Sequence, residues 1–123
     1  MKVISTDKAP AAIGPYSQAI DMGTCIFCSG QLPIDPATGQ MPADPADQAR
    51  QSMENVKALL AAAGTSLDKV VKTTVFIKNL EHFGAINEVY ASFFSGTFPA
   101  RSCVEVARLP KDALIEIEVI AVK

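Results

Sequence analysis

The residues best suited to nucleophilic or metal chemistry are few. Cys25 and Cys28 have the C-x-x-C spacing of zinc and thioredoxin-type redox sites, which place it on a tight loop or a helix start. Here the pair lies in a β-rich run, where residues three apart point to opposite faces, so we expect the two sulfurs to diverge. His82 is the only histidine, and no second Cys or His pair completes a metal site. We interpret Cys25 and Cys28 as half-buried strand residues and His82 as a solvated residue at a helix start, and we expect no metal.

Arg101 suggests a different chemistry. An arginine at the start of a strand can bind a planar carboxylate through two hydrogen bonds. Period-2 alternation places its side chain on the same strand face as Cys103 and Glu105. Cys103 has no neighbouring base to activate it, so we expect its backbone to matter more than its thiol. The alternative for Arg101 is a structural ion pair with a neighbouring glutamate.

Glu116 and Glu118 share one face of the predicted last strand. A carboxylate that is partly buried there would have a raised pKa and could accept a proton. The alternative is that both glutamates are ion-pair partners of Arg101 or Arg108.

An early predicted strand ends at Ser29, Gly30 and Gln31. A long irregular loop follows, in which positions 33, 36, 39, 42 and 45 are each proline or glycine. Loops of this length are often functional. The hydroxyl of Ser29 and the backbone N–H groups beside it could hold a small anion. A simple turn would account for the same residues.

The elements that must position these residues follow from hydrophobic periodicity and capping signals. Asp44 is a good N-cap, Pro45 suits the first helical position, and Gly64 ends the first helix. A second amphipathic pattern runs over residues 80–94 and ends at Gly96. Strands are predicted at residues 3–5, 16–20, 25–29, 70–77, 102–106 and 114–122.

The resulting order β-β-β-α-β-α-β-β predicts an α+β fold in which two helices cover one face of about six strands. The last strand carries large apolar residues on both faces, at Ile115, Ile117 and Val119 on one and at Ile120 and Val122 on the other. We therefore expect helices to cover one face of the sheet and other subunits to cover the opposite face.

Composition narrows the function classes. The 123 residues form one predicted domain, residues 1–123, with 49% hydrophobic residues, which excludes intrinsic disorder. The net charge is −2, from 11 basic and 13 acidic side chains, without the basic excess typical of nucleic-acid binders. No signal peptide or membrane span is evident, and an odd count of three cysteines is typical of reduced thiols in the cytosol.

Several segments together resemble the Rid (YjgF-like) family of reactive-intermediate, or 2-iminobutanoate/2-iminopropanoate, deaminases. The resemblance spans essentially the whole chain, and the stretch at residues 98–112 is its most specific part. The matching segments are APAAIGPYSQA at 9–19, SGQLP at 29–33, QARQS at 48–52, VKTTVF at 71–76, FPARSCVEVARLPKD at 98–112 and IEIE at 115–118.

The resemblance implies a chorismate-mutase-like, mostly antiparallel sheet, and a homotrimer with ligand sites at the clefts between subunits. It also implies hydrolysis of small 2-imino or enamine acids, released by pyridoxal-dependent dehydratases, to 2-oxo acids and ammonia without a cofactor. The implied site residues are Arg101 for the substrate carboxylate, Glu116 for the attacking water, Tyr16 as an aromatic wall, Ser29 and Gly30 as polar contacts, Cys103 through its backbone, and Asn87 at the cleft side. The segment Ser95-Gly96-Thr97 is shorter than in some relatives, which predicts a different cleft rim.

Two other functions fit the same fold. The chain could be a regulatory module that binds a small carboxylate without turning it over. It could also act on RNA, as a translation inhibitor or ribonuclease, although the acidic balance and the absence of an aromatic RNA-binding stripe argue against this. The presence of both Arg101 and Glu116 favours turnover.

Overall fold

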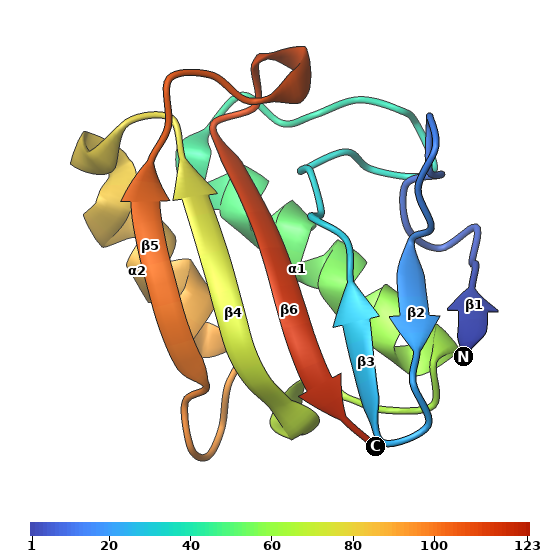
Figure 1. Cartoon of the computed structure of the whole chain (residues 1–123). Helices are drawn as coiled ribbons and strands as arrows, with labels where there is room; N and C mark the ends of the chain where they lie inside the picture. Colours follow the sequence, from blue (N-terminus) through green and yellow to red (C-terminus); the bar gives the residue numbers. More distant parts are fainter.

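The computed structural model, which describes residues 1–123, is a six-stranded sheet with two helices on one face (Figure 1). The strands are β1 (Lys2–Ile4), β2 (Ala19–Asp21), β3 (Cys25–Cys28), β4 (Val70–Ile77), β5 (Ala100–Glu105) and β6 (Ile115–Val122), and the helices are α1 (Pro45–Ala62) and α2 (Phe83–Ser92). The spatial order is β1-β2-β3-β6-β4-β5, and every neighbouring pair is antiparallel except β4 and β5. The predicted element order and α+β class are confirmed.

The ends of α1 lie where the capping residues predict. The Asp44 carboxylate accepts hydrogen bonds from the backbone N–H groups of Ala46 and Asp47, at 3.0 and 3.2 Å, which satisfies two of the free donors of the first turn. After the helix, Gly64 adopts a φ of +80°, in the left-handed region that favours glycine. No helix in the chain combines the length and the hydropathy that a membrane crossing would need.

The core lies between α1 and the central strand β6. Alternate residues of β6 face the helices and are at most 2% exposed, and they pack with apolar side chains of α1 that are fully buried. These residues are Ile115, Ile117, Val119 and Ala121 of β6 and Met53, Val56, Leu59 and Leu60 of α1. Each large aliphatic side chain buried in this way contributes about 1.5–3 kcal/mol to the free energy of unfolding. This layer therefore fixes the position of β6 and of the residues on its opposite face.

The opposite face of the sheet, called the open face here, has no helix over it (Figure 1). Register places Val3, Ile20, Phe27 and Ile120 side by side across the first four strands of this face. Val3 and Phe27 are 58% and 47% exposed. One face of β6 is therefore buried within the chain. The other face is not covered by any helix of the chain, so the cover that we predicted for it would be another subunit.

Four predicted boundaries were wrong by two residues or more. Residues 16–18 lie outside β2, although the Gln18 carbonyl still accepts from the Ser29 N–H at 2.9 Å. The Gln18 side chain binds the preceding loop, where it donates to the carbonyls of Thr6 and Pro10 and accepts from the Thr6 N–H. The second helix begins at Phe83 rather than residue 80, because Asn79 caps a separate 3-10 turn, Leu80–His82. It ends at Ser92, and β5 begins two residues earlier than predicted, at Ala100.

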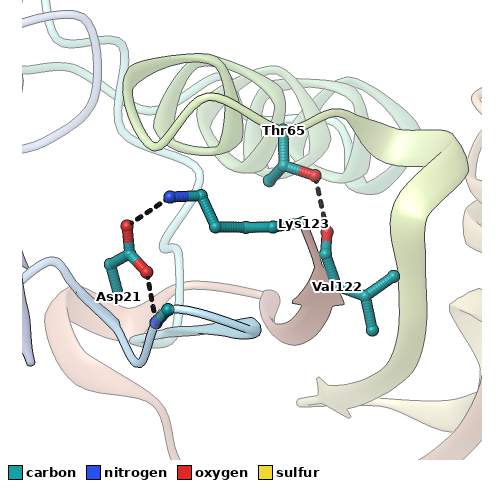
Figure 2. Close-up of polar contacts among 5 residues, drawn as sticks. Asp21, Thr65, Val122 and Lys123 are labelled. Carbon is teal, nitrogen blue, oxygen red and sulfur yellow. Dashed lines mark hydrogen bonds and ion pairs between the residues drawn. The ribbon is translucent and has the colours of Figure 1, made fainter.

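The end of β6 is fastened to the start of the sheet and to the loop after α1 (Figure 2). Lys123 Nζ lies 2.8 Å from the carboxylate of Asp21, which is buried and also accepts from the backbone N–H of Gly23. These bonds lower the pKa of Asp21, with the bond to Lys123 as the main cause. Thr65 donates its hydroxyl to the Val122 carbonyl at 2.7 Å. The bonds of Lys123 to Asp21 and of Thr65 to Val122 hold β6 in register beside β3.

Candidate functional site

The first group of functional side chains surrounds Arg101 on the edge strand β5 and is called the Arg101 cluster. Arg101 faces α2, where three residues at positions i, i+4 and i+7 meet its guanidinium: Phe83, Asn87 and Tyr90. The guanidinium donates to Asn87 Oδ1 at 2.7 Å. Its carbon lies 4.9 Å from the centre of the Tyr90 ring and 5.4 Å from that of Phe83, within the range of cation–π attraction.

Arg101 has no carboxylate partner in the chain. The ion pairs of the structure join Arg108 to Asp112 and Lys123 to Asp21. Glu105, the glutamate on its own strand face, accepts instead from the backbone N–H of Leu80 at 2.9 Å. The alternative of a structural ion pair is therefore wrong within one chain. The guanidinium is exposed and has used one of its five N–H donors, so it can bind a carboxylate through two others.

Cys103, two residues along the same strand, packs against the core beside the cluster. Burial raises the pKa of its thiol, an effect that the charge of Arg101 partly offsets. The thiol is therefore protonated near neutral pH and is a poor nucleophile. Because β5 is the edge strand of the sheet, half of its backbone groups have no strand partner, which leaves the Cys103 region free to bind through its main chain.

The second group of functional side chains lines a hollow of about 570 Å³, called the Glu116 cavity, on the other side of the sheet. Four of the site residues that the family resemblance implies meet here: Tyr16, Ser29, Gly30 and Glu116. The remaining wall includes Ile13, Leu32, Ile34, Lys111 and Glu118. A larger hollow of about 880 Å³, between α1 and the segment after α2, contains none of the predicted site residues but includes the short Ser95-Gly96-Thr97 segment.

Glu116 has the properties expected of a proton acceptor. Burial raises the pKa of its carboxyl group, and the like charge of Glu118 raises it further. No hydrogen bond occupies its oxygens. The side chain lies directly on Gly30, where an added Cβ would come within 2.8 Å of its carboxyl carbon. Gly30 is therefore required for the position of Glu116, which explains why a glycine stands at this strand end.

Ser29, Gly30 and Tyr16 present complementary polar groups to the cavity. The Ser29 hydroxyl donates to the Ser17 carbonyl at 2.6 Å, so its oxygen remains available as an acceptor. The backbone N–H of Gly30 has no partner in the chain and remains available as a donor. Tyr16 is 52% exposed, and its hydroxyl accepts a long bond of 3.4 Å from the Ile13 N–H. The cavity thus offers an acceptor, a donor and an aromatic wall.

The two groups face opposite sides of the sheet. Arg101 pairs in register with Thr73, and Thr73 pairs with Val119; both of these partners are buried on the helix side. Glu116 pairs with Phe76, which lies on the open face. Strand β4 also separates β5 from β6 (Figure 1). One chain therefore does not bring Arg101 and Glu116 to the same small molecule, and the site residues that the resemblance implies separate into two groups.

The other candidates do not form a site. Cys28 is buried while Cys25 is on the more open face, as the strand geometry predicted, and burial raises the pKa of Cys28 to about 12. His82 belongs to the 3-10 turn before α2 and is half-buried, with its Nδ1 shielded from solvent and without a partner, so it is less solvated than we expected. No group of three or more His, Cys, Asp or Glu side chains is arranged to hold a metal ion.

Comparison with known proteins decides the family. The model of the family described as Endoribonuclease L-PSP, to which YjgF belongs, matches residues 6–123. The chain belongs to this family. It is 59% identical to the 2-iminobutanoate/2-iminopropanoate deaminase of Escherichia coli K12, over 99% of this chain and 98% of that protein.

Two solved structures of family members superpose closely on this one. The crystal structure of E. coli YjgF has a TM-score of 0.98 at 58% identity and covers 100% of this chain and 99% of its own. E. coli TdcF, solved with bound serine, has a TM-score of 0.98 at 56% identity with the same coverage. The predicted family and fold are confirmed.

Sequence reasoning missed the aromatic part of the Arg101 cluster. The amphipathic pattern at residues 80–94 predicted a helix but did not identify Phe83 or Tyr90 as neighbours of Arg101. A signal was present, because Phe83, Asn87 and Tyr90 share one helix face by their spacing. What the sequence could not supply is that β5 returns parallel to β4 and places Arg101 over that face.

Proposed function

We propose that this protein hydrolyses small 2-imino acids, 2-iminobutanoate and 2-iminopropanoate, to 2-oxo acids and ammonia. The observation that carries the proposal is the exposed Arg101 guanidinium, held by an amide and two aromatic rings and left without a carboxylate partner. Near-identity of length and 59% sequence identity with the E. coli deaminase support the same substrate class.

The reaction needs a water, a carboxylate clamp and a proton acceptor. Arg101 binds the substrate carboxylate, which fixes C2 beside the water. Glu116 takes a proton from the water as its oxygen attacks C2 of the imine, and the C=N bond becomes a C–N single bond. Glu116 returns this proton to the nitrogen, which gives a neutral carbinolamine. Glu116 then carries the proton of the new hydroxyl group to the nitrogen as the C–N bond breaks, so ammonia leaves and C2 becomes the ketone of the 2-oxo acid. An enamine substrate first tautomerises to the imine by protonation at C3.

The raised pKa of Glu116 suits this double role. A carboxyl group whose pKa lies above the ordinary glutamate range is a stronger base when ionised. Its pKa is also closer to the working pH, where a group that both accepts and returns a proton is most effective. The oxygen of Ser29 and the backbone N–H of Gly30 are placed to orient the water or the nitrogen. Positioning and modest acid–base assistance suffice, because imines of this class already hydrolyse readily in water.

Arg101 and Glu116 can act together only if two copies of the chain meet. The Arg101 cluster of one copy would seat against the Glu116 cavity of the next, so that different surfaces are in contact at each interface. Such a head-to-tail contact closes into a ring when the rotation allows it, and each copy then contributes to two sites. We propose the homotrimer that the family resemblance implies, with the exposed apolar residues of the open face covered by neighbouring copies.

The test couples the protein to a threonine dehydratase that generates the enamine and imine in situ. Release of 2-oxobutanoate should be faster with the wild-type protein than with buffer, and Arg101→Ala and Glu116→Gln should each return it to the buffer rate. Binding of 2-oxobutanoate without acceleration by the wild type would contradict turnover and favour a regulatory carboxylate-binding module.

A further inference from the structure

We propose that Tyr90 is a positioning residue for Arg101 and that Thr73 fixes Tyr90 from behind. The inference rests on the proposed function, since it concerns how the carboxylate-binding guanidinium is presented. Tyr90 is not expected to touch the substrate. It acts through the orientation of Arg101.

Three neighbours contact the guanidinium of Arg101: Asn87, the Tyr90 ring and, at 5.4 Å from its carbon, the more distant Phe83 ring. Asn87 holds one guanidinium nitrogen through a 2.7 Å hydrogen bond, which fixes a point but not the plane of the group. The Tyr90 ring, 4.9 Å from the guanidinium carbon, fixes the plane. Arg101 is otherwise exposed on an edge strand, where a long side chain would sample many rotamers. Ordering it before binding removes a cost that the substrate would otherwise bear.

Tyr90 is itself held more rigidly than a packing residue requires. It is 4% exposed, and its hydroxyl forms a 2.8 Å hydrogen bond with that of Thr73, which is fully buried. A phenylalanine and a valine would fill the same space without burying two hydroxyls. Thr73 is also the residue that pairs with Arg101 in the β4–β5 ladder. The hydrogen bond therefore ties the ring to the strand position directly beside the arginine that it supports.

The chemistry of the ring agrees with this role. Burial raises the pKa of Tyr90 above its ordinary value, so the phenol stays protonated and neutral beside Arg101. Its attraction for the guanidinium comes through the ring face and leaves the N–H donors free for a carboxylate. An aspartate or glutamate in this place would instead compete for those donors.

The experiment compares Tyr90→Leu, Tyr90→Phe, Thr73→Val and the double variant Thr73→Val/Tyr90→Phe. Ile86→Ala is the matched control, because Ile86 is buried on the same helix but does not belong to the Arg101 cluster. Three kinds of measurement are made: ¹⁵N NMR gives the Nε–Hε signal and the order of the Arg101 side chain, calorimetry gives the dissociation constant of 2-oxobutanoate, and steady-state kinetics give KM and kcat for deamination.

Tyr90→Leu should lower the order of the Arg101 side chain and raise KM and the 2-oxobutanoate dissociation constant about tenfold, or about 1.4 kcal/mol. The effect on kcat should stay within about threefold, because the carboxylate is bound in both ground and transition states. Ile86→Ala should lower the melting temperature and leave the order of the Arg101 side chain, the 2-oxobutanoate dissociation constant and KM unchanged.

The variants that remove hydroxyls separate positioning from stability. Tyr90→Phe and Thr73→Val each leave one buried hydroxyl unpaired and should lower both the melting temperature and the order of Arg101. The double variant leaves none unpaired, so its melting temperature should recover while KM stays about two- to threefold raised. Recovery of KM together with the melting temperature would overturn the role of Thr73.

A wild-type KM, dissociation constant and Nε–Hε signal in Tyr90→Leu would overturn the role of Tyr90. The NMR comparison does not depend on turnover. A wild-type protein that fails to accelerate 2-oxobutanoate release would thus contradict the proposed function, while the order of Arg101 in Tyr90→Leu would still decide the role of Tyr90.

Discussion

Replacing Arg101 by alanine removes the proposed carboxylate clamp with little expected damage to the fold. Two charge-assisted hydrogen bonds contribute about 1.5–3 kcal/mol each, so their loss costs about 3–6 kcal/mol of transition-state stabilisation. This corresponds to about two to four decades in kcat/KM. Arg101→Lys should recover only part of the activity, because lysine keeps the charge but lacks the planar fork of donors.

The structure also limits the effect of the same substitution on stability. Arg101 is exposed and pairs with no carboxylate, so its removal leaves no buried charge unpaired. What is lost inside the chain is one hydrogen bond to Asn87 and the contacts with two rings. A partly exposed cation–π contact contributes about 0.5–1 kcal/mol, so the melting temperature should fall by only a few degrees.

The assay measures 2-oxobutanoate release, thermal unfolding and light scattering on one sample of Arg101→Ala. We expect a folded oligomer of wild-type mass without detectable catalysis. Near-wild-type turnover by such an oligomer would show that Arg101 does not bind the substrate carboxylate. Loss of activity together with dissociation would show instead that Arg101 supports an interface.

Four further results are expected. Glu116→Gln should abolish turnover and raise the melting temperature at neutral pH. The pKa of Glu116 is raised in the folded state, so the stabilising contribution of its protonated carboxyl group is lost as pH rises through that pKa. The higher melting temperature of the variant should therefore return to that of the wild type below about pH 4, where the carboxyl group is protonated in both the folded and the unfolded chain. Glu118→Gln should move the acidic limb of the kcat/KM–pH profile to lower pH, since it removes a like charge that raises the pKa of Glu116; an unmoved limb would assign it to another group. Gly30→Ala should lower kcat at least tenfold, because the new methyl group displaces the Glu116 carboxyl group, and a crystal structure with Glu116 in place would contradict this explanation. EDTA treatment and His82→Ala should leave the deamination rate unchanged, whereas loss on chelation and recovery with zinc would refute the metal-free mechanism.

Much of the fold was predictable because local signals agree with the final packing. Asp44, Pro45 and Gly64 mark the ends of α1 by their own chemistry, and the β-branched run at residues 70–77 matches β4 in full. The alternation of apolar residues along β6 predicted a face buried by helices, and α1 covers that face. These elements needed no knowledge of partners far away in the sequence.

The errors occur where a distant contact decides. Residues 16–18 have strand-like composition, but they lie outside β2, and the Gln18 side chain binds the loop at residues 6–10 while its carbonyl accepts from the Ser29 N–H. The candidate residues of the site were found one by one, and the structure collects most of them into the Glu116 cavity and the Arg101 cluster. That these lie on opposite faces depends on the sheet order, which periodicity alone does not determine.

In the proposed assembly, each site combines Arg101 of one copy with Glu116 of its neighbour. The most direct measurement mixes inactive Arg101→Ala and inactive Glu116→Gln subunits in equal amounts, refolds them together, and follows 2-oxobutanoate release. In a head-to-tail ring, each site receives an intact Arg101 with a chance of about one half and an intact Glu116 with the same chance, so about a quarter of wild-type activity should return. Each variant refolded alone should stay inactive. A mixture as inactive as its parents, although mass spectrometry shows that subunits have exchanged, would contradict the shared site.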